Sequence, residues 1–145
     1  MKRAYTFLRH PTDSQTDKII RLYQEAGWWT GQARENPELI RRIVAGSHCF
    51  VLAVAEDEII GMGRAISDGI NDAYIQDVTV LPGFQGQGIG TGIVEEILKR
   101  LRADGLQWIG LIAGSHSHPF YRKLGFEKMP AATPMIMMMN FDGVL

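Results

Sequence analysis

Between residues 78 and 91 the chain reads Val78-Thr79-Val80-Leu81-Pro82-Gly83-Phe84-Gln85-Gly86-Gln87-Gly88-Ile89-Gly90-Thr91. A β-branched run stops at a proline, passes through a glycine-rich turn and continues directly into an amphipathic helical pattern. Such a turn leaves backbone N–H groups unpaired at the positive end of the helix dipole, which favours an anion there. Because glycine has no side chain, a diphosphate can approach this backbone closely without a lysine or a metal ion.

Two common phosphate-binding loops do not match this stretch. A Walker loop requires Lys and then Ser or Thr after its last glycine, whereas Gly88 is followed by Ile89. A dinucleotide-binding loop requires the spacing G-x-G-x-x-G, but Thr91 stands at the third glycine position, and no acidic residue ends the strand expected at Trp108–Ala113. These mismatches exclude a nucleotide triphosphatase and disfavour a Rossmann fold.

The stretch resembles the acyl-CoA loop of the GCN5-related N-acetyltransferases, the GNAT family. In that family Gln or Arg is followed by two residues, Gly, one residue, and Gly or Ala, and here the loop reads Gln85-Gly86-Gln87-Gly88-Ile89-Gly90. Two further elements fit the family pattern in the same order: Val80-x-Pro82 upstream and the run Phe120–Phe126, FYRKLGF, downstream. The resemblance is strongest over residues 72–126 and only architectural before them.

The resemblance implies an α/β (α+β) GNAT fold in a single domain over residues 1–145, with a central mixed, mostly antiparallel sheet flanked by helices. The sequence pattern predicts the order β-α-α-β-β-β-α-β-α-β-β. Strands are expected at 5–8, 49–56, 59–66, 72–80, 108–113, 126–129 and 135–140, with a hairpin turn at Asp57-Glu58. One helix ends before Gly27 and has Tyr23 in its apolar stripe; others are expected at 37–44, 88–104 and 119–124.

Composition limits the class of protein. The chain has 145 residues, of which 46% are hydrophobic, so we expect a globular domain with a real core. A net charge of −1 disfavours nucleic acid and anionic membranes as partners. No secretory signal or membrane-spanning run is present in the sequence, and the one cysteine, Cys49, begins an apolar run that favours core packing over a nucleophile. We therefore expect a cytoplasmic protein.

The resemblance implies acetyl-CoA as the co-substrate, and no metal. The pantetheine arm is expected to bond main-chain groups of the strand before the glycine turn, as an added strand would, while the turn holds the diphosphate. The residues expected to bind acetyl-CoA are Val78, Thr79, Val80, Gln85, Gly86, Gln87, Gly88, Ile89, Gly90, Thr91, Phe120 and Tyr121. The family often has Asn near Gly114 for the pantetheine arm, and its absence here puts that contact in doubt.

Acetyl transfer needs a proton donor for the departing thiolate and an acceptor for the proton of the amine. The resemblance gives Tyr121 the role of general acid; the alternative is that it only packs its helix against the core. Polyamine acetyltransferases of the family usually carry Glu-Asp where this chain has Gln76-Asp77, and Gln76 cannot take a proton. Asp77 is the base if a β-bulge turns it toward the substrate, and otherwise a buried or capping carboxylate.

The face of the strand on which Asp77 lies decides between these two roles, and simple strand alternation predicts that face. It puts Tyr74, Gln76, Val78 and Val80 on one face and Ile75, Asp77 and Thr79 on the other. A water held by Gln76, Tyr74 and backbone carbonyls is the third route for the proton.

The acceptor site is expected around the loop after the first helix. Trp28 and Trp29 form either an aromatic wall for an aryl amine or a lid over the core. Tyr74 and Gln76 are expected beside them. His116 lies in the loop before the Tyr121 helix. It either acts as a base or contacts the substrate, or it is a solvated or helix-capping loop residue.

Together these features predict an N-acetyltransferase that moves an acetyl group to the primary amine of a small molecule, an aryl or aralkyl amine, by direct transfer in a ternary complex. Two alternatives remain open: a non-catalytic acyl-CoA sensor or interaction module, and an acetyltransferase acting on a protein or peptide amine. The resemblance also allows a homodimer, because C-terminal strands in this fold often pair between subunits.

Overall fold

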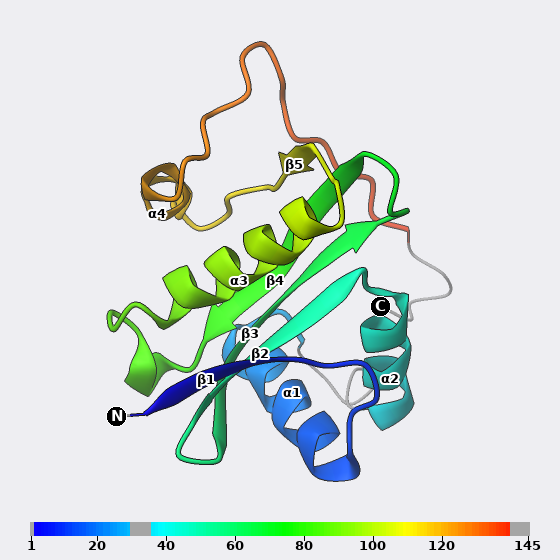
Figure 1. The fold of residues 1–145 in the computed structure, drawn as a ribbon, viewed down its shortest axis with the longest axis vertical. Helices are drawn as coiled ribbons and strands as arrows, with labels where there is room; N and C mark the ends of the chain where they lie inside the picture. The colour runs from blue at the N-terminus through cyan, green and yellow to red at the C-terminus, as the bar shows by residue number, and fades with distance from the viewer. Residues whose placement is uncertain (1, 30–35, 140–145) are drawn as a thin grey trace. The chain divides into compact units, whose positions relative to one another are not determined.

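The structure is a computed structural model that describes residues 2–29 and 36–139. Its internal contacts divide into two compact units, residues 1–111 and 112–145, and each is described by itself. In chain order the elements are β1 (Arg3–Phe7), α1 (Asp13–Glu25), α2 (Pro37–Gly46), β2 (Cys49–Ala55), β3 (Glu58–Ser67), β4 (Asp72–Val80), the 3-10 turn η2 (Pro82–Phe84), α3 (Ile89–Ala103), β5 (Trp108–Gly110) and α4 (His118–Lys123) (Figure 1).

Five strands form one sheet in the order β1-β2-β3-β4-β5. Neighbouring strands are antiparallel except β4 and β5, which are parallel, so the expected mixed, mostly antiparallel sheet is confirmed. The β2–β3 hairpin turns at Glu56 and Asp57, whose φ angles of 49° and 67° suit a tight two-residue turn. The turn lies one residue earlier than predicted, and Glu58 begins β3.

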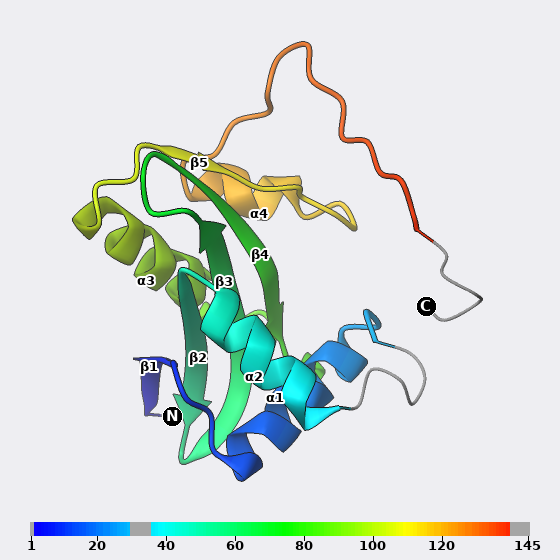
Figure 2. The same cartoon turned by 90° about the vertical axis from the view of Figure 1, so that its right-hand side faces the viewer.

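Helices cover both faces of the sheet in residues 1–111, with α1 and α2 on one face and α3 on the other (Figure 2). Thr12 caps α1 through a reciprocal capping box with Gln15, and Asn36 caps α2 just before Pro37. These caps let each helix start where its apolar stripe meets the sheet. The buried core on this face includes Ile19, Leu22, Tyr23, Ile40, Val44, Phe50, Leu52 and Met62.

Helix α3 lies close to β3 because two positions of that strand have no side chain. A Cβ atom at Gly63 would lie 2.7 Å from Cγ2 of Ile93, and one at Gly61 would lie 3.0 Å from Cδ1 of the same residue. The space is filled by the helix. The buried side chains of α3 are Ile89, Ile93, Val94, Ile97, Leu98 and Leu101.

The prediction of two C-terminal strands is wrong. Over residues 112–139 the structure forms one regular element, α4, and no strand at 126–129 or 135–139; residue 140 lies outside the described residues. Apolar residues alone do not make a strand, because each strand needs a neighbour for its N–H and C=O groups. Met135, Ile136 and Met137 remain 82–89% exposed. Strand β5 is also shorter than predicted, since its pairing with β4 lasts three residues.

The close approach of α3 to β3 predicts an asymmetric response to adding one methyl group. Gly63→Ala should lower the free energy of unfolding by about 1–3 kcal/mol, because the new methyl overlaps Ile93. Gly46→Ala, at the end of α2 where nothing lies within 4 Å of the new methyl, should change it by less than about 1 kcal/mol. Urea unfolding of both variants measures this. Equal urea midpoints for the two variants would show that the packing of α3 on β3 does not depend on the missing side chain at Gly63.

Candidate active site

The glycine turn joins β4 to α3 through backbone that only glycine adopts easily. Gly86 and Gly88 have φ angles of 76° and 81°, in the left-handed region. Gly88 is the N-cap of α3 and offers no side-chain cap. Nε2 of Gln85 donates a hydrogen bond to the carbonyl oxygen of Val80 at 2.9 Å, which ties the turn to the end of β4.

Six consecutive backbone N–H groups in this turn, those of residues 86–91, make no hydrogen bond to any described residue. The first bond of the helix runs from the N–H of Gly92 to the carbonyl oxygen of Gly88, at 3.1 Å. Strand β1 lies against the same turn: Tyr5 packs on Gly92, and Nη1 of Arg3 is 3.8 Å from where a Cβ of Gly88 would stand. Unpaired donors, a helix N-terminus and a guanidinium fit a diphosphate.

The outer edge of β4 is open next to this turn. Strand β5 pairs with β4 only from Asp72 to Tyr74, and no strand of the described residues 2–29 and 36–111 pairs with that edge over residues 75–80. Main-chain groups around Val78 and Val80 are therefore available to an extended ligand, as an added strand would use them. This opening suits the pantetheine arm expected from the sequence.

A β-bulge interrupts β4 at Asp77. Thr79 pairs with Met62 and Gln76 pairs with Arg64, so two residues of β4 stand opposite one residue of β3. Asp77 has a φ of 58°. Predicted alternation is therefore wrong beyond Gln76: the bulge turns Asp77 to the face covered by α1. The expected bulge is present, while the role of Asp77 as base stays a prediction.

Val78 confirms the change of face, since its Cγ2 lies 3.2 Å from where a Cβ of Gly63 would stand, beside α3. One extra residue thus moves the following side chains of β4 to the opposite face from the one that simple alternation gives.

Asp77 is held by two donors on one carboxylate oxygen. Oη of Tyr23 donates to Oδ2 of Asp77 at 2.7 Å, and Nε of Arg64 donates to the same oxygen at 2.6 Å. Oδ1 accepts no hydrogen bond from a described residue. Arg64 extends the cluster through Nη1 to Ser47 at 3.4 Å and through Nη2 to Oε1 of Gln76 at 3.5 Å. The Arg64 and Asp77 side chains are only 15% and 23% exposed.

Tyr23 links this carboxylate to an aromatic group. Burial, and then the neighbouring negative charge of Asp77, raise the pKa of Tyr23 well above its usual range, so it remains a hydroxyl donor. The Trp29 ring stacks on the Tyr23 ring at 4.1 Å, while the Trp28 ring meets it edge-on at 6.1 Å. Trp29 packs on the core as a lid, whereas Trp28 stays 49% exposed. Aromatic surface and a carboxylate thus lie one tyrosine ring apart.

Tyr74 occupies a different setting from the one expected. Its ring meets that of Trp108 in β5 at 5.2 Å, and no hydrogen bond or ring contact joins it to the Asp77 cluster. Gln76 does reach the cluster, through its long hydrogen bond with Arg64. Of the residues expected on the amine side in residues 1–111, the structure brings together Trp28, Trp29, Gln76 and Asp77.

The second unit carries Tyr121 and His116. In α4 the Tyr121 ring contacts Phe120 at 4.9 Å and Phe126 at 5.9 Å, both edge-to-face. Burial raises the pKa of Tyr121, so the phenol holds its proton at neutral pH and can donate it. His116 has a φ of 60° in the turn before α4. The roles expected for these residues remain predictions.

Sequence reasoning missed three residues of the site: Tyr23, Arg64 and Arg3. Tyr23 sits in an apolar helical stripe and was expected only as core, and its hydroxyl gave no separate signal. Arg64 could have been found, because a charged residue inside the apolar strand 59–66 calls for a buried partner of opposite charge. Nothing in the sequence around Arg3 indicates its place beside the glycine turn.

Among the described residues, no group of three or more His, Cys, Asp and Glu side chains is arranged to hold a metal ion. None of the described helices has the length and apolar character needed to cross a membrane.

A family model, two related sequences and a solved structure that match this chain are all those of acetyltransferases. The model of the Acetyltransferase (GNAT) family matches residues 6–126. Serotonin N-acetyltransferase 2, chloroplastic, of Oryza sativa subsp. japonica is 34% identical over 134 residues, covering 90% of this chain and 65% of that protein. Histone acetyltransferase TAP1 of Glycine max is 44% identical over 75 residues, covering 52% of this chain and 32% of that protein. The chain thus spans between a third and two thirds of these relatives' lengths.

A solved structure agrees in fold. The GNAT family acetyltransferase from Streptococcus pneumoniae TIGR4 superposes with a TM-score of 0.78 and 26% sequence identity, covering 97% of this chain and all of that one. The expected fold class is therefore confirmed.

The Asp77 cluster predicts a coupling between two charges. Asp77→Asn should lower the free energy of unfolding by about 2 kcal/mol, because it leaves the Arg64 guanidinium largely buried without its carboxylate. Adding Arg64→Met should restore much of that loss, since no unpaired charge remains. Urea unfolding of the two single variants and the double variant measures the coupling. Losses that simply add would show that the two charges do not interact.

Proposed function

The chain belongs to the Acetyltransferase (GNAT) family, and we propose that it transfers the acetyl group of acetyl-CoA to the primary amine of a small arylalkylamine. The observation that carries the acceptor class is the Asp77 carboxylate, with Oδ1 unbonded among the described residues, one tyrosine ring away from the two tryptophans. The name of the rice relative, a serotonin N-acetyltransferase, supports an aromatic amine.

Acetyl-CoA, when bound, supplies the acetyl group as a thioester. The N–H groups of residues 86–91 would hold its diphosphate, with Arg3 adding a positive charge beside them. Main-chain groups at Val78 and Val80, on the open edge of β4, would bond the pantetheine arm. The resemblance to the family adds Phe120 and Tyr121 of α4 to the proposed donor residues.

On the acceptor side, Asp77 receives the amine. An alkylamine with a pKa near 10 arrives mostly protonated. Oδ1 of Asp77 binds its ammonium group and takes a proton from it through a water molecule, while Tyr23 and Arg64 hold Oδ2 in place. The neutral amine then forms the new C–N bond as the C–S bond breaks, and Tyr121 gives its phenolic proton to the departing sulfur. The nitrogen of the new amide loses its extra proton, which returns to Tyr121 through solvent.

The single carboxylate sets the charge of the acceptor. Gln76 is neutral, so Asp77, which also pairs with Arg64, is the one carboxylate of this cluster among the described residues, and this suits a monoamine better than a polyamine. The exposed face of Trp28 offers a surface for the aryl ring. Location in the cytoplasm and assembly as a homodimer stay parts of the proposal; the rice relative is named as chloroplastic.

The donor site predicts that Gly88→Val weakens acetyl-CoA binding about tenfold or more, because the side chain blocks approach to the unpaired N–H groups. Gly105→Val is the matched control. Gly105 has a φ of 82° and open space around its Cβ position, so the backbone strain is similar, but it lies at the other end of α3. Isothermal titration calorimetry compares the two. If they bind acetyl-CoA equally well, the turn does not hold the diphosphate.

The acceptor class is tested by thiol release from acetyl-CoA over a panel of amines. We expect kcat/KM for tryptamine to exceed that for spermidine by about tenfold. Tyr121→Phe should lower kcat about a hundredfold or more while acetyl-CoA affinity is retained. Preference for a lysine peptide would move the substrate to a protein amine, and no release with any amine would favour an acyl-CoA sensor. Unchanged kcat in Tyr121→Phe would remove the proposed acid.

A further inference from the structure

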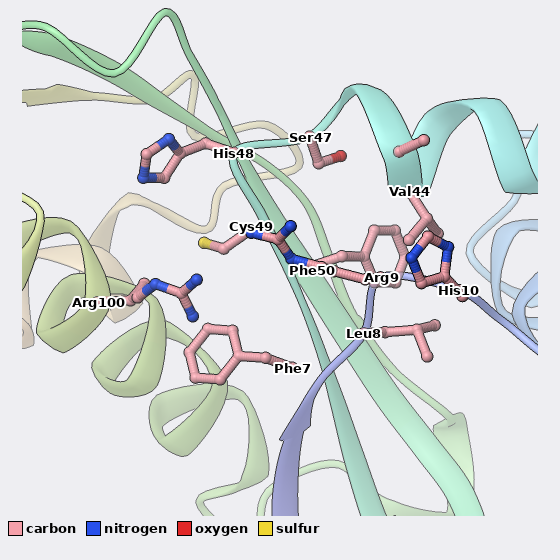
Figure 3. Close-up of a pocket in the computed structure, with 11 residues that line it drawn as sticks. Phe7, Leu8, Arg9, His10, Val44, Ser47, His48, Cys49, Phe50 and Arg100 are labelled. Carbon is pink, nitrogen blue, oxygen red and sulfur yellow. The ribbon is translucent and has the colours of Figure 1, made fainter.

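A pocket separate from the candidate active site lies at the far end of α3 from the glycine turn (Figure 3). Strand β1 runs alongside α3 and shows how far apart the two sites are. At the start of α3, Arg3 lies beside Gly88; near the end of α3, the Cζ atom of Arg100 lies 4.9 Å from the centre of the Phe7 ring. Twelve helical residues span about 18 Å. The pocket has a volume of about 220 Å³ and is formed by the end of β1, the end of α2, the start of β2 and α3.

The pocket is lined by basic groups and by no carboxylate. Arg9, His10, His48 and Arg100 all line it. Figure 3 shows the guanidinium groups of Arg9 and Arg100 turned toward the same space. Arg9 and His10 make no hydrogen bond or ion pair with any described residue. The pocket therefore holds positive charge that the described part of the protein does not neutralise.

Two of these basic residues, His48 and Arg100, share the carboxylate of Asp104. Oδ2 of Asp104 lies 2.8 Å from Nε2 of His48 and 3.2 Å from Nε of Arg100. The hydrogen bond from His48, followed by the charge of Arg100, lowers the pKa of Asp104, so this carboxylate stays ionised and serves those two groups. Cys49 adds no negative charge, because burial raises the pKa of its thiol to about 11. Arg9 is left to receive an external anion.

We propose that this pocket binds a small organic carboxylate. Two guanidinium groups facing one space match the planar, two-oxygen geometry of a carboxylate. Phe7, Phe50 and Val44 in the lining provide apolar contact for a short apolar or aryl group attached to it. The volume lies below the roughly 300–1,000 Å³ of sites for larger ligands, so the ligand is small. Binding joins β1 to α3, away from the acyl-transfer site.

The experiment titrates the isotopically labelled full chain with phenylacetate and follows its backbone amide resonances. We expect the largest shifts at His10, His48 and the neighbouring residues of β2. Phenylacetamide, which has the same shape without the charge, and inorganic phosphate, which has the charge without the ring, should both bind at least about tenfold more weakly. Arg9→Gln should weaken phenylacetate binding by about tenfold.

Arg21→Gln is the matched control, since Arg21 is also exposed and lies on α1 outside the pocket lining. It should leave phenylacetate binding unchanged. Because Arg9 is exposed and makes no bond to a described residue, its variant should unfold at the same urea concentration as the control. The proposal is overturned if phenylacetate fails to bind at millimolar concentration, shifts residues elsewhere, binds no better than phenylacetamide or phosphate, or binds Arg9→Gln as tightly as the wild type.

Discussion

The bulge at Asp77 is the constraint on which the amine side of this protein depends. One extra residue in β4 brings a carboxylate to the α1 face, where Tyr23 and Arg64 bond the same oxygen. Those two bonds connect three elements, α1, β3 and β4. Tyr23 also holds the aromatic group in place, because the Trp29 ring stacks on its ring and the backbone N–H groups of Trp28 and Trp29 donate to its backbone carbonyl oxygen. A partly buried carboxylate is thereby preorganised, with one oxygen bound and the other free of hydrogen bonds from the described residues.

The donor side depends on a second backbone constraint, which acts through packing. Glycines at positions 61 and 63 let α3 approach β3 closely, and the helix starts directly after the turn that follows β4. Within the described part of the chain, its first N–H groups have no hydrogen-bond partner, and they lie beside the unpaired edge of β4. The bulge serves this side too, because it turns Val78 toward α3 and away from the amine side. One irregularity in β4 thus places the proposed acceptor residue Asp77 and the side chain of Val78 on opposite faces of the sheet.

Local patterns were predictable from the sequence, and long-range partners were not. The glycine turn and α3 could be identified because adjacent residues specify them. The bulge could only be stated as an alternative, since the extra residue shows itself only in pairing with β3. Tyr23 and Arg64 lie 54 and 13 residues from Asp77, and apolar periodicity hides such polar links. The prediction of strands at 126–129 and 135–140 is wrong because an apolar sequence pattern does not show whether a neighbouring strand is there to pair with.

In the proposed reaction the Asp77 carboxylate receives the amine. The most direct measurement is kcat/KM of Asp77→Asn for tryptamine, with acetyl-CoA affinity measured on the same preparation to show that the fold is intact. Asparagine keeps the shape and an oxygen for Tyr23 and Arg64, but it cannot bind an ammonium as strongly or take its proton. We predict a loss of about a hundredfold or more in kcat/KM with acetyl-CoA affinity unchanged. A kcat/KM within a few-fold of the wild type would contradict the claim and leave Asp77 with a structural role alone.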